Sequence, residues 1–178
     1  LRGHPSCGIP VIALHEGYPG HHLQLVHANQ VKSRLRRVLG TTVFVEGWAL
    51  YCEEMMYDAG FYADPRSRLL QLKDQLWRAC RVIIDVGLHT RNMTFEQAVD
   101  LLVEDAKLQR VHAEKEVTRY TFTPTQPMSY LVGKRQIMDL RADYERRAGA
   151  SFRLKEFHDL LLGLGSIPVC MVRKALGM

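Results

Sequence analysis

Hydrophobic residues recur at helical spacing along most of the chain, and the alternation typical of strands is nearly absent. Thr94 with Gln97 makes a capping box, and apolar positions then follow at steps of three and four up to about Tyr120. Asp64 before Pro65 reads as an N-cap followed by the first helical residue. The pattern therefore predicts an all-α fold. The expected helices cover residues 42 to 58, 65 to about 90, 94 to about 120, 126 to 148, 154 to 162 and 168 to 176.

The clearest interruption is the short segment TFTPTQP, residues 121 to 127, which holds two prolines. There is no repeat and no low-complexity linker, and 178 residues are enough for one buried core. We therefore expect a single helical domain over residues 1 to 178. The chain starts at Leu1 and reaches a histidine-rich motif after only fourteen residues, so we expect it to be a portion of something longer.

The formal net charge of +5 comes from clusters of Lys and Arg at 32 to 37 and 145 to 147. Because no aromatic residues are interleaved with them, solvated helix faces are favoured and no nucleic acid partner is expected. No apolar run reaches the roughly 18 residues of a membrane span, and no signal peptide is evident. The sequence does not fix the cellular compartment, and the cytoplasm is favoured for the chain as given. The cysteines are widely spaced and expected to be reduced: Cys7, Cys52, Cys80 and Cys170.

The stretch HEGYPGHHLQ, residues 15 to 24, begins like the zinc-peptidase motif HExxH. In that motif two histidines one helical turn apart bind one metal, and the glutamate between them takes a proton from the attacking water. Here His15 and Glu16 are present, but Pro19 stands at the place of the second histidine. On a straight helix neither His21 nor His22 would lie beside His15.

Pro19 and Gly20 change that expectation, because proline donates no backbone hydrogen bond and glycine tolerates unusual dihedral angles. They predict a break or bulge between Glu16 and His21 that returns His21 to the place of the missing histidine. The alternative is a helix that simply begins at Gly20, with histidines that only pack.

A third ligand is predicted in the next apolar segment, where Glu46 lies between Val45 and Trp48. A carboxylate in such surroundings is costly to bury without a partner, and zinc sites with two histidines often take a glutamate from another helix. The alternative partner is an arginine inside a helical bundle. Glu53 is a candidate acceptor for a ligand imidazole, and a surface charge is the competing interpretation.

HEGYPGHHLQ followed by FVEGWALYCEE, residues 44 to 54, resembles the bacterial metallopeptidase-like family catalogued as domain of unknown function 885. The resemblance extends through the segments at 76 to 98, 123 to 137 and 157 to 169. It implies a zincin of the kind that uses two histidines and one glutamate. Members of that family are longer, which implies that this chain is their C-terminal, site-bearing portion and that an N-terminal region or a homo-oligomer completes the cleft.

More distantly, the chain is similar to the helical peptidases typified by angiotensin-converting enzyme and thimet oligopeptidase. In those peptidases the ligand glutamate follows the second histidine by some two dozen residues, and Glu46 suits either His21 or His22. The resemblance also implies that Tyr130, within PMSYLV, donates a hydrogen bond to the oxyanion. The chain departs from that group in having Tyr120 ten residues before Tyr130 and Leu50 four after Glu46. A packing role is the alternative for Tyr130.

Four polar residues at 78, 81, 85 and 89 form one stripe on the long helix from Pro65, which lines either a cleft or a solvated face. Arg119 and Arg135 flank the TFTPTQP break and are candidate substrate anchors, with solvated helix ends as the alternative.

The sequence therefore predicts an all-α, zincin-like helical domain with a broken metal-binding helix, which cleaves a peptide or amide substrate. The alternative is a catalytically inactive metal-binding or helical interaction module. The expected ligands of one zinc ion are His15, His21 and Glu46, with His22 as the alternate ligand or a neighbour of the ligand shell, Glu16 as general base and Tyr130 as oxyanion donor.

Overall fold

The structure, a computed structural model, describes residues 5–178, and this part of the chain contains helices and no strand. None of its helices combines the length and apolar character that a membrane span requires. Two short 3-10 helices lie at Ser6–Gly8 and Gly149–Ser151. The α-helices are α1 (Ile9–Glu16), α2 (His21–Gln30), α3 (Arg34–Val38), α4 (Thr42–Asp58), α5 (Pro65–Thr90), α6 (Phe95–Glu104), α7 (Arg110–Phe122), α8 (Gln126–Ala148), α9 (Leu154–Gly163) and α10 (Val169–Ala175).

Most of the predicted helices are confirmed. Their ends could be predicted because capping groups close by in the sequence set them. The Thr41 and Asp64 side chains accept hydrogen bonds from backbone N–H groups in the first turns of α4 and α5. The predicted capping box of Thr94 and Gln97 is present at the start of α6. Gly149, with φ of 55°, follows the end of α8.

One predicted helix, residues 94 to about 120, is wrong, because the structure divides it into α6 and α7. The chain turns at 105 to 109, where Lys107 takes a φ of 55° and the Leu108 N–H donates to the carbonyl of Leu102. The two helices pack against each other, and Leu102 and Val117 are fully buried between them. Periodicity could not reveal this turn, since no glycine or proline marks it.

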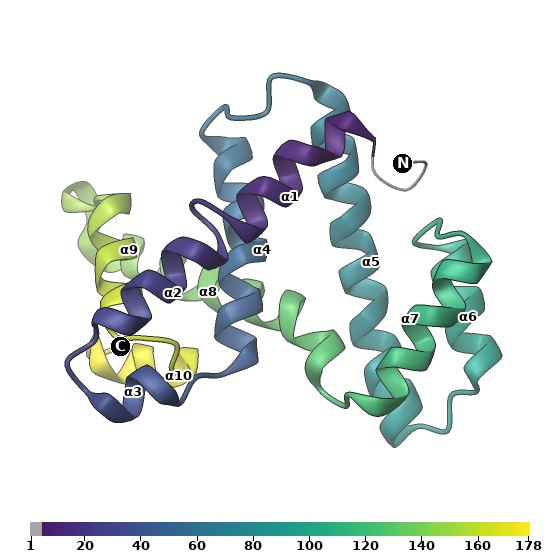
Figure 1. Cartoon of the computed structure of the whole chain (residues 1–178). Helices are drawn as coiled ribbons and strands as arrows, with labels where there is room; N and C mark the ends of the chain where they lie inside the picture. The colour runs from purple at the N-terminus through teal and green to yellow at the C-terminus, as the bar shows by residue number, and fades with distance from the viewer. Residues whose placement is uncertain (1–4) are drawn as a thin grey trace.

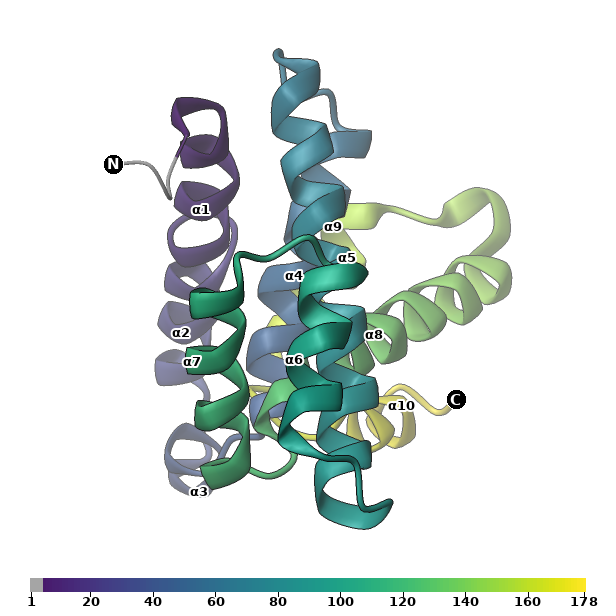
Figure 2. The ribbon, with the colours of Figure 1, turned by 90° about the vertical axis from the view of Figure 1, so that its right-hand side faces the viewer.

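The long helices α4 and α5 are joined by the segment 59–64, and α8 packs against both of them, crossing behind α4 in the view of Figure 1. Helices α1 and α2 follow each other and both contact α4, which they cross in the view of Figure 1. Helices α6 and α7 pack against the C-terminal half of α5 (Figures 1 and 2). Residues 5–178 form two apolar cores. One gathers around Trp48 and Phe157 from α4 and α9, and the other around Ile84 and Val99 from α5 and α6.

Among the helices that the structure describes, α4 and α8 make the most extensive contact, and two glycines allow it. A Cβ atom on Gly133 would lie 1.8 Å from the carbonyl oxygen of Val43, and one on Gly47 would lie 2.4 Å from the carbonyl carbon of Gly133. Only glycine fits at such a backbone crossing. The crossing therefore brings the backbone next to Glu46 close to the first turns of α8.

Candidate functional site

The predicted break in the histidine helix is present. Helix α1 ends at Glu16 and α2 begins at His21. A Cβ atom on Gly20 would lie only 1.9 Å from the carbonyl oxygen of His15, so glycine is required where the chain turns back on α1. The turn is held from α4, because the indole N–H of Trp48 donates to the carbonyl oxygen of Pro19 at 2.9 Å.

This turn brings the two predicted ligand imidazoles together. The ring centroids of His15 and His21 are 4.8 Å apart, with the rings nearly perpendicular. One candidate donor atom from each of His15, Glu16 and His21 lies within 4.8 Å of the others. His22, the alternate candidate, is exposed and lies outside this group. Of the two adjacent histidines, it is therefore His21 that faces His15.

Glu46 from α4 completes the cluster. Its Oε2 atom lies 3.3 Å from Nε2 of His21 and 4.0 Å from Nε2 of His15. Within residues 5–178, no lysine or arginine nitrogen lies within 4.0 Å of this carboxylate, so the alternative of a buried arginine partner is not what the structure shows. Burial by itself raises the pKa of Glu46, but hydrogen bonding and charge from His21, with the Tyr130 hydroxyl, outweigh it and lower that pKa below its usual value. Glu46 is therefore ionised at neutral pH.

Glu53 orients the first histidine. Its side chain is 1% exposed, and Oε1 lies 2.7 Å from Nδ1 of His15. Because this carboxylate is an acceptor, it favours the tautomer in which Nδ1 carries the proton and Nε2 presents a lone pair towards Glu46. A guanidinium nitrogen of Arg78 lies 4.0 Å from the same carboxylate oxygen. Glu53 is thus a buried partner of His15 and not a surface charge, whereas its neighbour Glu54 pairs with the buried Lys134.

Tyr130, in the second turn of α8, faces the cluster. Burial and then the nearby Glu46 carboxylate raise the pKa of its hydroxyl, which therefore stays protonated at neutral pH. The amide of Gln126 donates to this hydroxyl at 3.1 Å, and the guanidinium of Arg81 lies 4.9 Å from the ring centroid. Tyr130 is therefore positioned both by its own helix and by α5.

The two candidate substrate anchors lie in different surroundings. Arg119 donates to Gln126 Oε1 at 3.0 Å and to Glu116 at 2.9 Å, so one glutamine links it to Tyr130. Arg135 is on an exposed face of α8, with 77% of its side chain accessible, and pairs with Asp139 four residues on. The structure brings Arg119 towards the cluster and leaves Arg135 apart from it.

One supporting residue, Glu116, was not identified from the sequence, and Asp85 was expected beside the cleft but not as a helix cap. Glu116 accepts hydrogen bonds from Arg81, Arg119 and the Tyr120 hydroxyl, and so joins α5 to α7. Asp85 accepts from the backbone N–H groups of Thr125 and Met128, at 3.0 and 3.1 Å, which caps the start of α8.

The polar stripe on α5 indicated a special role for its members without revealing the partners. Arg81 and Asp85 are buried, so the stripe is part of a buried network and is not a solvated face. The partner Glu116 gave no comparable signal, because it lies in an otherwise ordinary polar segment of α7.

Comparison with known proteins places the chain in a family without assigning an activity. The family model described as "Bacterial protein of unknown function (DUF885)" matches residues 1–176. A solved structure of a "putative lipoprotein of unknown function" from Shewanella oneidensis is 36% identical, with a TM-score of 0.93 over 100% of this chain and 33% of its own. Another, described as a "putative lipoprotein" from Colwellia psychrerythraea, is 34% identical, with a TM-score of 0.93 over 97% of this chain and 30% of its own. No curated protein matches the chain.

This chain thus spans about a third of the length of the related structures.

Proposed function

The chain belongs to the DUF885 family of bacterial proteins, and we propose that it carries the active site of a zinc-dependent hydrolase that cleaves peptide or amide bonds. The observation that supports this most strongly is the convergence of His15, His21 and Glu46 beside Glu16. Two imidazoles and one carboxylate are the donor set of catalytic zinc sites in many metallopeptidases. A zincin-like relationship is part of this proposal.

The distances between the donor atoms support zinc as the ion. Zinc lies roughly 2.0–2.2 Å from imidazole nitrogen and carboxylate oxygen, so neighbouring ligand atoms of a tetrahedral site are about 3.3 Å apart. The separations from Glu46 Oε2, 3.3 Å to His21 and 4.0 Å to His15, are close to that value. The tautomer favoured by Glu53 leaves Nε2 of His15 free to coordinate. His15, His21 and Glu46 would therefore hold the ion, with His22 outside the ligand set.

When bound, zinc would act as a Lewis acid that polarises the scissile carbonyl and makes water a stronger nucleophile at neutral pH. Glu16 follows His15 directly at the last residue of α1 and is exposed, so solvent and substrate can reach its carboxylate. It would take one proton from the attacking water and give it to the leaving amine nitrogen as the C–N bond breaks. The products are then a carboxylic acid and an amine.

Tyr130 would stabilise the charge that develops on the carbonyl oxygen. Its hydroxyl is protonated, lies beside Glu46 and is held by Gln126, so it can donate a hydrogen bond with little reorganisation. Arg119, linked through Gln126, is the better placed of the two candidate substrate anchors, and Arg135 would act only if another part of a longer protein brought substrate to its face.

Metal analysis combined with one substitution tests the proposal. The purified protein should contain about one zinc per chain and cleave members of a peptide library. Glu16→Gln should keep the metal and lower the rate by about 10²-fold or more, because the proton acceptor is lost. Glu104→Gln, an exposed glutamate on α6, is the matched control and should change neither.

The outcomes separate the alternatives. Zinc without turnover, in this chain and in the full-length protein, would support a catalytically inactive metal-binding module. Turnover that survives Glu16→Gln unchanged would contradict the mechanism. Absence of both metal and turnover would leave the helical interaction module.

A further inference from the structure

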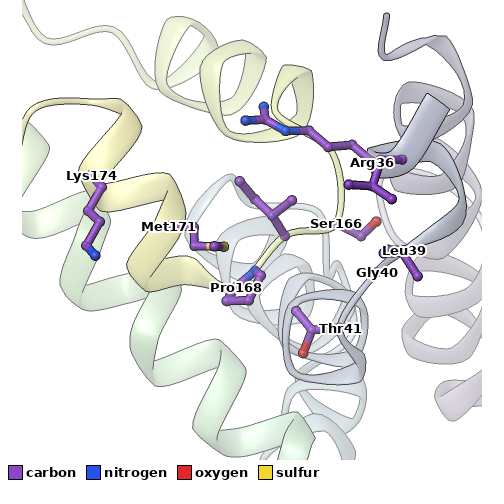
Figure 3. A pocket seen from close by; sticks show the side chains of 10 residues that line it. Arg36, Leu39, Gly40, Thr41, Ser166, Pro168, Met171 and Lys174 are labelled. Atoms are coloured by element: carbon purple, nitrogen blue, oxygen red, sulfur yellow. The ribbon is translucent and has the colours of Figure 1, made fainter. Parts of the chain in front are cut away.

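A second feature of the molecule, independent of the histidine cluster, is a pocket of about 520 Å³ at the opposite end of α2 from the cluster. It lies between α3, the start of α4, the 166–168 segment and α10 (Figure 3). Its walls are mainly apolar. They include Leu35, Leu39, Ile167, Pro168 and Met171.

The pocket is rimmed by positive charge that no carboxylate of its own segments balances. There is no Asp or Glu between Glu16 and Glu46, or after Asp159. Arg36 extends over the pocket from α3, and Lys174 lies on its other side on α10 (Figure 3). Within residues 5–178 neither of them has an acidic side chain within 4.0 Å, in contrast to the neighbouring Arg173, which pairs with Asp143.

The apolar walls are also more exposed than usual for side chains of this size. The residues Leu35, Leu39 and Met171 are 67%, 59% and 55% accessible to solvent. They come from separate segments of the chain and line the same pocket. Contiguous exposed apolar surface of this kind commonly marks a binding site. An occupant with an apolar chain would remove this surface from water.

Two polar groups of Ser166 in the wall already have hydrogen-bond partners. The Ser166 hydroxyl accepts a hydrogen bond from the buried Gln24 at 2.5 Å, and the Ser166 carbonyl accepts one from the Thr41 N–H at 2.8 Å. A Cβ atom on Gly40 would lie 3.1 Å from Ser166 Cβ, so the wall is tightly packed here. A hydrocarbon chain placed against Ser166 would therefore not deprive these two groups of a hydrogen bond.

We propose that this pocket binds a single-chain anionic amphiphile, with an unbranched alkyl chain along Leu39 and Met171, a carboxylate head at Arg36, and Lys174 adding positive charge on the other side. A small apolar pocket with a few placed charges is the usual form of a small-molecule site. The unbalanced cations select an anionic head over a neutral or cationic one.

Calorimetric titration of the 178-residue chain with decanoate, below its micelle concentration, tests the proposal, with decanol and decyltrimethylammonium as head-group controls. Binding should be saturable at one site and at least about tenfold tighter for decanoate than for either control. Two pairs of substitutions at exposed or half-exposed positions show whether decanoate binds in the pocket or on the surrounding surface. Arg36→Glu and Leu39→Glu change pocket residues, whereas Arg34→Glu and Val38→Glu make the same charge changes on α3 outside the pocket.

Loss of about tenfold or more in affinity with the first pair, and little change with the second, would support the pocket. Equal weakening by all four, together with binding to anionic vesicles in place of free decanoate, would mean a general lipid-surface contact and overturn the proposal. So would the absence of saturable binding, or a dimer in sedimentation analysis that Leu39→Glu dissociates. Thermal unfolding of each variant confirms that it is folded.

Discussion

Nδ1 of His15 lies 2.7 Å from the buried carboxylate of Glu53, two turns further along α4 than Glu46. One helix thus supplies both a candidate ligand carboxylate and the group that sets the tautomer of a candidate ligand imidazole. Such outer partners fix the tautomer and the orientation of a ligand ring, and their loss typically weakens metal binding.

Glu53→Gln should therefore weaken zinc binding. The amide keeps the shape of the side chain but can present an N–H group to His15, which disfavours the tautomer that leaves Nε2 free. We expect zinc affinity to fall by about 10- to 100-fold, measured by competition with a chelator of known affinity. Glu104→Gln, at an exposed position, serves as the control, and unchanged affinity in Glu53→Gln would contradict the assigned role.

Tyr130→Phe should lower turnover without a matching change in KM. Phenylalanine keeps the ring beneath the Arg81 guanidinium and removes only the hydroxyl that would donate to the oxyanion. Loss of one such donor costs roughly 10²- to 10³-fold in kcat. Steady-state kinetics on a cleaved peptide would measure it, with zinc content as the control for an intact site. A change confined to KM would instead indicate a role in substrate binding.

Much of the fold could be predicted, since the relevant signals are local. Asp64 begins α5 by accepting a hydrogen bond from the Arg66 N–H, and Pro65 has the fixed φ of a first helical residue. Pro19 and Gly20 break the histidine helix through equally local backbone effects. That His15, His21 and Glu46 lie together was predicted as well, because the chemistry that they share is visible in the residue types.

What could not be predicted depends on contacts between distant segments. The turn around Lys107 is favoured by the packing of α6 against α7, and its residues carry no strong turn signal. Glu116 accepts hydrogen bonds from both Arg81 and Tyr120 only because α5 lies beside α7 in the fold. The choice of His21 over His22 likewise required the orientation of α2, which is set by Trp48 and the turn at Pro19.

Gly47→Ala should destabilise the protein, because the added methyl group would meet the backbone of Gly133 at 2.4 Å. Forcing α4 and α8 apart should cost about 1–3 kcal/mol or more in the free energy of unfolding. The shift would also move Tyr130 away from Glu46, so zinc content should change less than turnover. Urea unfolding followed by circular dichroism measures the stability.

The matched control for this substitution is Gly163→Ala. Gly163 is the last residue of α9, and a Cβ atom there would meet nothing within 4 Å. The same change in volume should therefore leave stability unchanged or raise it by up to about 1 kcal/mol. Similar destabilisation by both substitutions would contradict the assigned role of the crossing, because alanine is the better helix former and only Gly47 lacks room for a methyl group.

The pH dependence of stability should contain a contribution from His158. Its Nε2 atom lies 2.8 Å from the Tyr51 hydroxyl and its ring packs edge-on against Trp48, and burial, followed by the nearby Arg141 charge, lowers its pKa to about 4. Above the usual histidine pKa of about 6.5 the residue is neutral in both the folded and the unfolded chain, and its contribution is constant. As the pH falls from about 6.5 to about 4, the unfolded chain takes up the proton first, so stability declines by at most about 1.4 kcal/mol per pH unit from this group.

In His158→Gln the decline in stability that is due to His158 should disappear. Urea midpoints measured at intervals between pH 7 and pH 4, in the original chain and in the variant, would show the two curves converging towards low pH if the assignment is correct, and parallel curves would refute it.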